Sequence, residues 1–142
     1  MKGQSLIVQF LLFFIIGLGL FAAISGIFRT QSDIIREDIS SSNRELTASY
    51  LSSIAISMAA SCKGCNITTA TVHLRNITAG KVTEMKLSGS GLQVTSLPDG
   101  GSFSTAMHNL HKSHILQGAA VTALPVVLSY NNTKNKQEFT LK

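Results

Sequence analysis

The sequence predicts an α+β protein in which one long N-terminal helix precedes a small antiparallel β-sandwich or barrel domain. Residues 3–28 form an apolar run without an ionisable side chain. About 20 apolar residues are enough to cross a bilayer as a helix. From Thr68 onward, apolar and polar residues alternate, and Gly, Pro and Asn clusters separate the short segments. That pattern is typical of antiparallel strands.

The helix is expected to continue beyond the apolar run. No proline occurs before Pro98, and apolar residues recur at steps of seven and four, which places them on one helix face. The recurring residues are Phe28, Ile35, Ile39, Leu46, Tyr50, Ile54 and Met58. We therefore expect one helix over residues 4–60, about 80 Å long at 1.5 Å per residue, with an apolar face along its second half.

Two other kinds of segment can contain a long apolar run. The core helix of a soluble protein is rarely apolar on every side over such a length. A secretory signal peptide has an apolar region of about 7–15 residues before a small-residue cleavage site. Residues 22–25 read Ala-Ala-Ile-Ser and could act as such a site, although the run itself is longer.

The remaining residues, 61–142, are expected to form the β-domain. Strand-like segments cover residues 68–75, 82–87, 92–97 and 137–142, and Pro98 begins a turn. Residues 121–130 also resemble a strand, with Pro125 at an edge or a bulge. Residues 103–117 could be a loop or a short helix.

Cys62 and Cys65 lie where the helix should end, in the order Cys-Lys-Gly-Cys. We expect a disulfide that ties the helix end to the first strand in an oxidising exterior. Free thiols, a redox pair and a metal site are the alternatives. A structural zinc site requires four ligands, and a thioredoxin-like pair belongs near a βαβ pattern.

Small residues interrupt the apolar run. Glycines in a helix interior are unfavourable, but in an apolar medium small side chains let helices approach closely. We therefore expect helix-packing positions, although glycine is also common in membrane helices. The positions are Gly17, Gly19, Ala22, Ala23 and Gly26.

Asn66, Asn76 and Asn131 each begin an Asn-x-Ser/Thr sequon, which can accept a glycan in an exported domain. Lys2 precedes the apolar run, and positive charge favours the cytoplasmic side. Both observations predict a cytoplasmic N-terminus and an external C-terminal domain.

Several function classes are disfavoured. The net charge of +5 is dilute, with 13% charged residues and no Lys/Arg cluster, so no nucleic-acid binding is expected. After the helix the acidic residues are Glu84, Asp99 and Glu138, a poor supply for acid–base catalysis. We expect no enzyme and no cofactor.

His108, His111 and His114 could bind a metal or simply belong to a polar loop.

The head of the chain, Lys2-Gly3-Gln4-Ser5-Leu6, together with the long helix, resembles the class III signal peptide of archaeal type IV pilins and archaellins. The resemblance implies cleavage between Gly3 and Gln4 by a prepilin peptidase, which would leave residues 1–3 as a short leader. The chain departs from the family pattern at Val8, where the family often has Glu.

The resemblance also implies a cell-surface filament for adhesion or motility. The helix would reside in the membrane before assembly and then pack with further copies, with an assembly ATPase and platform proteins as partners. A membrane-anchored accessory protein, resembling archaellum stator-type proteins, is the alternative; its β-domain would bind a surface-layer or filament partner. A minor pilin that primes or caps an assembly is a third interpretation.

Overall fold

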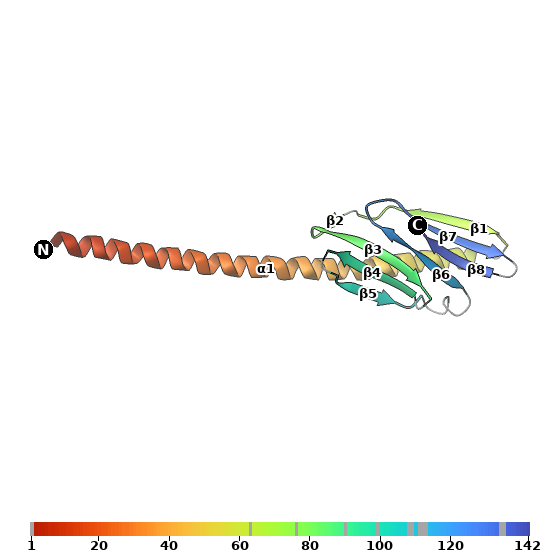
Figure 1. The fold of residues 1–142 in the computed structure, drawn as a ribbon, viewed down its shortest axis with the longest axis horizontal. Helices are drawn as coiled ribbons and strands as arrows, with labels where there is room; N and C mark the ends of the chain where they lie inside the picture. Colours follow the sequence, from red (N-terminus) through yellow and green to blue (C-terminus); the bar gives the residue numbers. More distant parts are fainter. Residues whose placement is uncertain are drawn as a thin grey trace. The chain divides into compact units, whose positions relative to one another are not determined.

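A computed structural model describes residues 2–62, 64–75, 77–89, 91–98, 100–107, 110, 114–133 and 136–142, with side chains from Leu6 onward. Helix α1 spans Lys2–Ser61 (Figure 1). The strands are β1 (Ile67–Val72), β2 (Ile77–Thr78), β3 (Lys81–Ser88), β4 (Gly91–Leu97), β5 (Ser102–Thr105), β6 (Ile115–Val121), β7 (Val126–Thr133) and β8 (Lys136–Leu141). The predicted fold class, α+β with a long N-terminal helix and a β-domain, is confirmed.

The chain forms two compact units, Met1–Glu37 and Asp38–Lys142. The second unit contains the last part of α1 and all the described strands. These strands form one eight-stranded sheet in the order β1-β7-β8-β6-β3-β4-β5, with β2 paired to β3 beside that path. Neighbouring strands are antiparallel except β6 and β8, which run parallel.

The last part of α1 covers the inner face of this sheet. Its buried side chains include Ala48, Leu51, Ala55 and Met58. They join one hydrophobic core with the inward-facing side chains of the strands, which include Met85, Val94, Leu128 and Phe139. Alanines at the contact let the helix backbone lie close to the sheet, so packing rather than propensity stabilises this part of the helix.

The helix face that packs on the sheet differs from the apolar face that the sequence period defines. The predicted residues Ile39, Leu46 and Tyr50 are 49%, 67% and 53% exposed, and only Ile54 and Met58 at its end reach the core. The buried face instead begins with Ser40 and Arg44. The side that the sheet buries combines small residues, Ala48 and Ala55, with the larger Leu51 and Met58.

Two details of the strand prediction were also wrong. Pro125 lies in the turn between β6 and β7 rather than inside a strand, which suits a residue that cannot donate a ladder hydrogen bond. Strands β5 and β6 both overlap residues 103–117, which were expected to be a loop or a short helix. Strand β6 is the less expected of the two. Its Gly-Ala-Ala sequence has weak β-propensity, but it is paired on both sides, with β3 and β8.

A buried polar cluster joins the helix to the end of β4. The Arg44 guanidinium donates from Nη1 to Ser40 Oγ and to Ser96 Oγ, each at 3.1 Å. The two serine hydroxyls are themselves 3.0 Å apart. All three side chains are buried, so these hydrogen bonds offset the cost of removing the polar groups from water. The guanidinium also lies against the backbone of Gly101.

Candidate functional site

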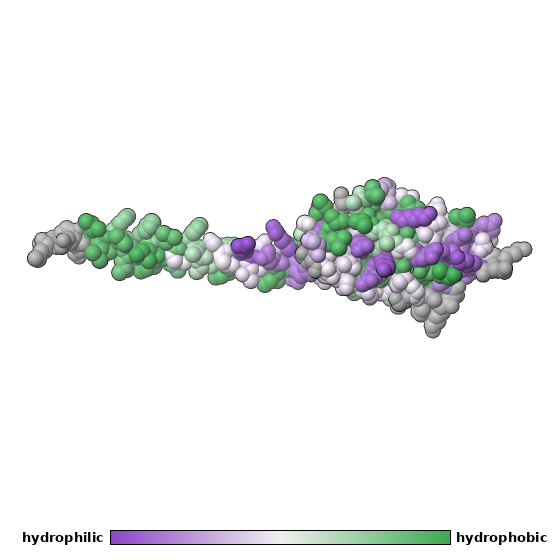
Figure 2. Space-filling model, in the orientation of Figure 1, coloured by the Kyte–Doolittle hydropathy of each residue, from purple (hydrophilic) through white to green (hydrophobic). Residues whose placement is uncertain are grey.

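The first unit, Met1–Glu37, consists of helix with an uncovered apolar surface. Its large hydrophobic side chains from Leu6 to Phe28 are between 49% and 73% exposed, and Figure 2 shows this stretch as hydrophobic. The helix is long and apolar enough to cross a membrane, and no residue of its most apolar window is buried in this chain. The stretch is not part of the hydrophobic core that the described residues form, and an apolar surface of this extent suits a lipid environment or further helices.

Hydroxyl groups within this helix find partners inside it. Ser25 Oγ donates to the Phe21 carbonyl at 2.8 Å, and Thr30 Oγ1 donates to the Gly26 carbonyl at 3.1 Å. A polar group without a partner is costly in hydrocarbon. These two side chains can therefore enter an apolar environment without a further hydrogen-bond donor or acceptor.

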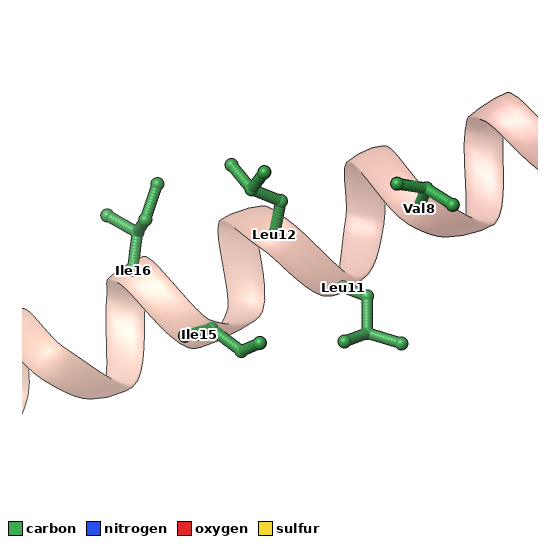
Figure 3. A pocket seen from close by; sticks show the side chains of 5 residues that line it. All are labelled: Val8, Leu11, Leu12, Ile15 and Ile16. Carbon is green, nitrogen blue, oxygen red and sulfur yellow. The ribbon is translucent and has the colours of Figure 1, made fainter.

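A shallow apolar groove runs along this helix (Figure 3). Its lining consists of Val8, Leu11, Leu12, Ile15 and Ile16, which follow the i, i+3, i+4, i+7 and i+8 spacing of one helix face. Because one helix supplies every wall and no lining side chain is polar, the groove lacks the placed polar groups of a small-molecule site. It suits the side chains of another apolar helix or lipid chains.

The predicted packing glycines have space around them. A Cβ added at Gly17, Gly19 or Gly26 would meet nothing within 4 Å, and Ala22 and Ala23 are exposed. Within one chain these small residues have no packing role, so close approach of another helix at these positions stays a prediction.

The predicted cleavage site lies at the start of α1. The backbone of Gly3 and Gln4 is helical, and their side chains lie outside the described ones. Cleavage between these residues stays a prediction.

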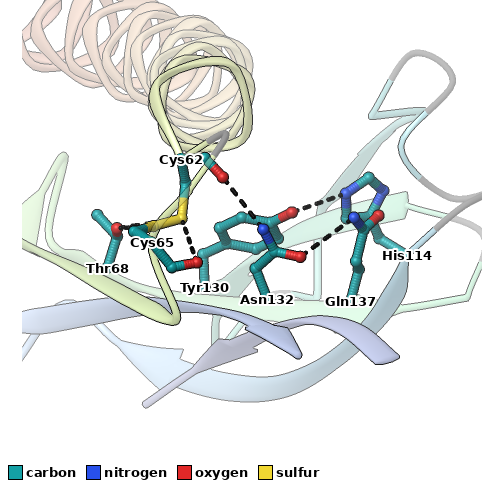
Figure 4. Close-up of a disulfide and its surroundings, with 7 residues drawn as sticks. All are labelled: Cys62, Cys65, Thr68, His114, Tyr130, Asn132 and Gln137. Atoms are coloured by element: carbon teal, nitrogen blue, oxygen red, sulfur yellow. Dashed lines mark hydrogen bonds between the residues drawn. A yellow bond between two sulfur atoms is a disulfide. The ribbon is translucent and has the colours of Figure 1, made fainter. Parts of the chain in front are cut away.

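Cys62 and Cys65 are joined by a disulfide, the pairing expected from the sequence. Cys62 is buried in the core, and the Thr68 hydroxyl lies 3.0 Å from Cys65 Sγ and 3.5 Å from Cys62 Sγ. The Asn132 side chain donates to the Cys62 carbonyl at 3.1 Å and accepts from Gln137 at 3.3 Å (Figure 4). The end of α1 is thus attached to β1, β7 and β8.

The sequons occupy different environments. Asn66 is exposed immediately before β1, a position that an enzyme transferring a glycan can reach. Asn131 lies within β7 and is half-buried, and its Oδ1 atom has no hydrogen-bond partner among the described residues. Asn76 lies outside the described residues. Glycan occupancy stays a prediction, and the geometry favours Asn66.

Of the three spaced histidines, His114 alone is described; His108 and His111 lie outside the described residues. His114 Nδ1 is 3.2 Å from the Leu110 carbonyl, and Nε2 is 3.3 Å from the Tyr130 hydroxyl. Its ring centroid lies 5.6 Å from those of Tyr130 and Phe139. His114 is therefore half-buried and packs against two core side chains, Tyr130 and Phe139.

The described side chains of the compact unit include few groups suited to catalysis or metal binding. Burial raises the pKa of the Tyr130 phenol above its ordinary value, so the phenol stays protonated to a higher pH than an exposed tyrosine does. Among the described side chains, no three His, Cys, Asp or Glu residues gather in a way that could hold a metal ion.

No family model matches this chain, and no curated protein or solved structure that was compared with it matches either.

Proposed function

We propose that this protein is the structural subunit of an archaeal type IV pilus-like filament at the cell surface. The supporting observation is that α1 combines an exposed apolar part and a part packed on the sheet in one helix. One uninterrupted helix, Lys2–Ser61, begins with an apolar stretch whose large side chains are 49–73% exposed and ends packed on the sheet of a β-domain. The head sequence from Lys2 to Leu6 adds the resemblance to a class III signal peptide.

In this proposal the apolar stretch has two successive environments. Before assembly it lies in the cytoplasmic membrane, with the N-terminus inside and the β-domain outside. After cleavage by a prepilin peptidase it leaves the bilayer and packs against the same stretch of further copies. Burying an apolar side chain from water contributes about 1.5–3 kcal/mol, so the stretch cannot pass through water exposed and must transfer directly from lipid to the helix bundle.

Mass spectrometry of the native protein tests the proposal. The expected N-terminal tryptic peptide begins at Gln4 and ends at Arg29, since Arg29 is the first basic residue after Lys2. Electron microscopy should find filaments that contain the chain. A Gly3→Val variant should keep residues 1–3, remain in the membrane fraction and form no filaments.

A native chain that keeps residues 1–3 and remains in the membrane without filaments would contradict the proposal. That result would favour the membrane-anchored accessory protein, in which an uncleaved helix holds the β-domain at the surface for a surface-layer or filament partner.

A further inference from the structure

The sequon at Asn66 adjoins the disulfide at the end of α1. Cys65 directly precedes Asn66, and Thr68 is the hydroxyl-bearing third residue of the sequon. Glycan transfer to asparagine requires a serine or threonine at this third position, so the transferase must contact the hydroxyl as well as the acceptor. Exposure of Asn66 is therefore necessary for modification but does not suffice, because the Thr68 hydroxyl must be accessible too.

The Thr68 hydroxyl faces the disulfide (Figure 4). It lies 3.0 Å from Cys65 Sγ and 3.5 Å from Cys62 Sγ, and the hydroxyl is the donor because disulfide sulfurs carry no hydrogen. Thr68 is half-buried, on the same side of β1 as Ala70 and Val72, which pack against or belong to the core. The folded, oxidised protein thus turns this hydroxyl away from a transferase.

The backbone of the sequon is held in place as well. The Asn132 amide donates to the Asn66 carbonyl at 2.8 Å, and β1 pairs with β7 from its first residue onward. Strand β1 stands at an edge of the sheet, where a segment can open without unfolding of the whole domain. The disulfide opposes this opening, because it joins Cys65 to Cys62, which is buried in the core.

We propose that the Cys62–Cys65 disulfide closes the Asn66 sequon to glycan transfer, so that Asn66 is modified only while the two cysteines are thiols. The inference rests on the external β-domain of the proposed function and does not require a filament. The two reactions have a fixed order in a modified chain. Asn66 is exposed, so a glycan already attached there leaves the thiols free to pair afterwards.

Both reactions need a partner from outside the chain. In glycan transfer, the Asn66 Nδ2 atom loses a proton and bonds to the anomeric carbon of a lipid-linked oligosaccharide, whose lipid phosphate leaves. In disulfide formation, the two thiols give two electrons and two protons to an external disulfide, which becomes a dithiol. Whichever reaction occurs first on a new chain decides whether Asn66 carries a glycan.

The sequon at Asn131 provides a comparison within the same domain. Its hydroxyl belongs to Thr133, which donates to the Lys136 carbonyl at 2.9 Å. Asn131 itself lies within β7, between β1 and β8. Modification at Asn131 therefore depends on whether these strands have formed, and the disulfide has no direct part in it.

Translation of the full chain with microsomal membranes tests the inference, because these membranes supply a transferase and its lipid-linked oligosaccharide. One variant keeps only the Asn66 sequon, through Asn76→Gln and Asn131→Gln. A second variant keeps only the Asn131 sequon, through Asn66→Gln and Asn76→Gln. Each attached glycan slows the protein on a gel, and treatment with an endoglycosidase confirms the assignment.

Cys62→Ala removes the disulfide and leaves residues 65–68 unchanged. In the variant with the Asn66 sequon, it should raise the modified fraction roughly twofold or more, because the start of β1 can then open. Dithiothreitol during translation should have the same effect on the unaltered cysteines and no further effect on Cys62→Ala. The modified fraction at Asn131 should not change with Cys62→Ala.

Val94→Ala is the matched control for lost core packing. Val94 is fully buried on β4, so its truncation destabilises the domain while the disulfide stays intact. It should leave the modified fraction at Asn66 unchanged. An equal rise at Asn66 in Val94→Ala and Cys62→Ala would show that general unfolding controls modification, and would overturn the inference.

The remaining outcomes separate this inference from the proposed function. Equal modification of Asn66 with and without the disulfide would overturn the inference alone. Absence of glycan at both sequons in every variant would overturn the inference together with the external position of the β-domain. Native cells without filaments that contain this chain would contradict the proposed function and leave the inference standing, since a membrane-anchored protein exposes the same domain.

Discussion

At the scale of single residues, Arg44 illustrates how a polar side chain is accommodated in the core. Its guanidinium is buried, donates to two serine hydroxyls and lies against Gly101. A Cβ built on Gly101 would lie 2.7 Å from Arg44 Nη1 and 3.1 Å from Cζ. A side chain at residue 101 would therefore occupy the space that the Arg44 guanidinium fills.

We predict that Gly101→Ala destabilises the compact unit by about 0.5–1.5 kcal/mol, the net contribution of a hydrogen bond, because the Arg44 guanidinium must shift away from Ser40 and Ser96. In an Arg44→Ala background the same change should cost little, because the obstructing guanidinium is gone. Chemical unfolding of the four proteins of this double-mutant cycle, in detergent, measures the coupling. Equal losses in both backgrounds would contradict the proposed contact.

Tyr130 gives a prediction about pH. Burial raises the pKa of its phenol above the ordinary 10.0, so the folded protein keeps a proton that the unfolded chain loses. The free energy of unfolding should therefore fall as pH rises from about 10 towards the folded pKa, by at most about 1.4 kcal/mol per unit.

Tyr130→Phe should remove this contribution to the pH dependence. At neutral pH, the free energy of unfolding that this variant loses reports the missing hydrogen bond to His114. Comparison of the two proteins is necessary because lysines titrate in the same range. Identical alkaline slopes for wild type and Tyr130→Phe would show that the phenol does not contribute.

At the scale of elements, the end of α1 is held by the Cys62–Cys65 disulfide and by Asn132 on β7. We predict that both cysteines stay unlabelled by thiol reagents until the protein is reduced. Replacing both with serine should lower stability by about 2 kcal/mol, the chain-entropy estimate for a short loop. Quantitative labelling of the unreduced protein would refute the disulfide.

The apolar stretch of α1 makes no packing contact with the β-domain core, so any free energy gained by burying it comes from lipid or from other chains. Nothing within 4 Å occupies the space beside Gly19, so a larger side chain fits the single chain. Leucine also favours helix over glycine by about 0.5–1 kcal/mol. Any loss caused by bulk at this position must therefore arise between copies.

At the scale of the whole molecule, we predict that Gly19→Leu abolishes filaments while membrane insertion stays intact. Close helix packing in a filament excludes the added side chain, whereas lipid accommodates it. Filament counts on cells, compared with abundance in the membrane fraction, measure the two effects, and Gly19→Ala is the milder control. Normal filaments from Gly19→Leu cells would exclude close packing at this glycine.

The order of elements was predictable because it depends on local properties. A long apolar run without proline indicates a helix wherever it resides, and alternation after Thr68 indicates strands. The same reasoning paired Cys62 with Cys65, because residues three apart at a helix end need no knowledge of the rest of the fold. Strand β6 escaped prediction because its small residues become a strand only between two partners.

The sequence alone determined that this chain has one apolar helix followed by a β-domain, since hydrophobicity and its period are encoded residue by residue. Only the tertiary structure decided which helix face the sheet covers. That choice depends on how the helix and the sheet pack together: Ala48, Leu51 and Ala55 lie on the covered side of the helix, and Leu46 and Tyr50 lie on its exposed side.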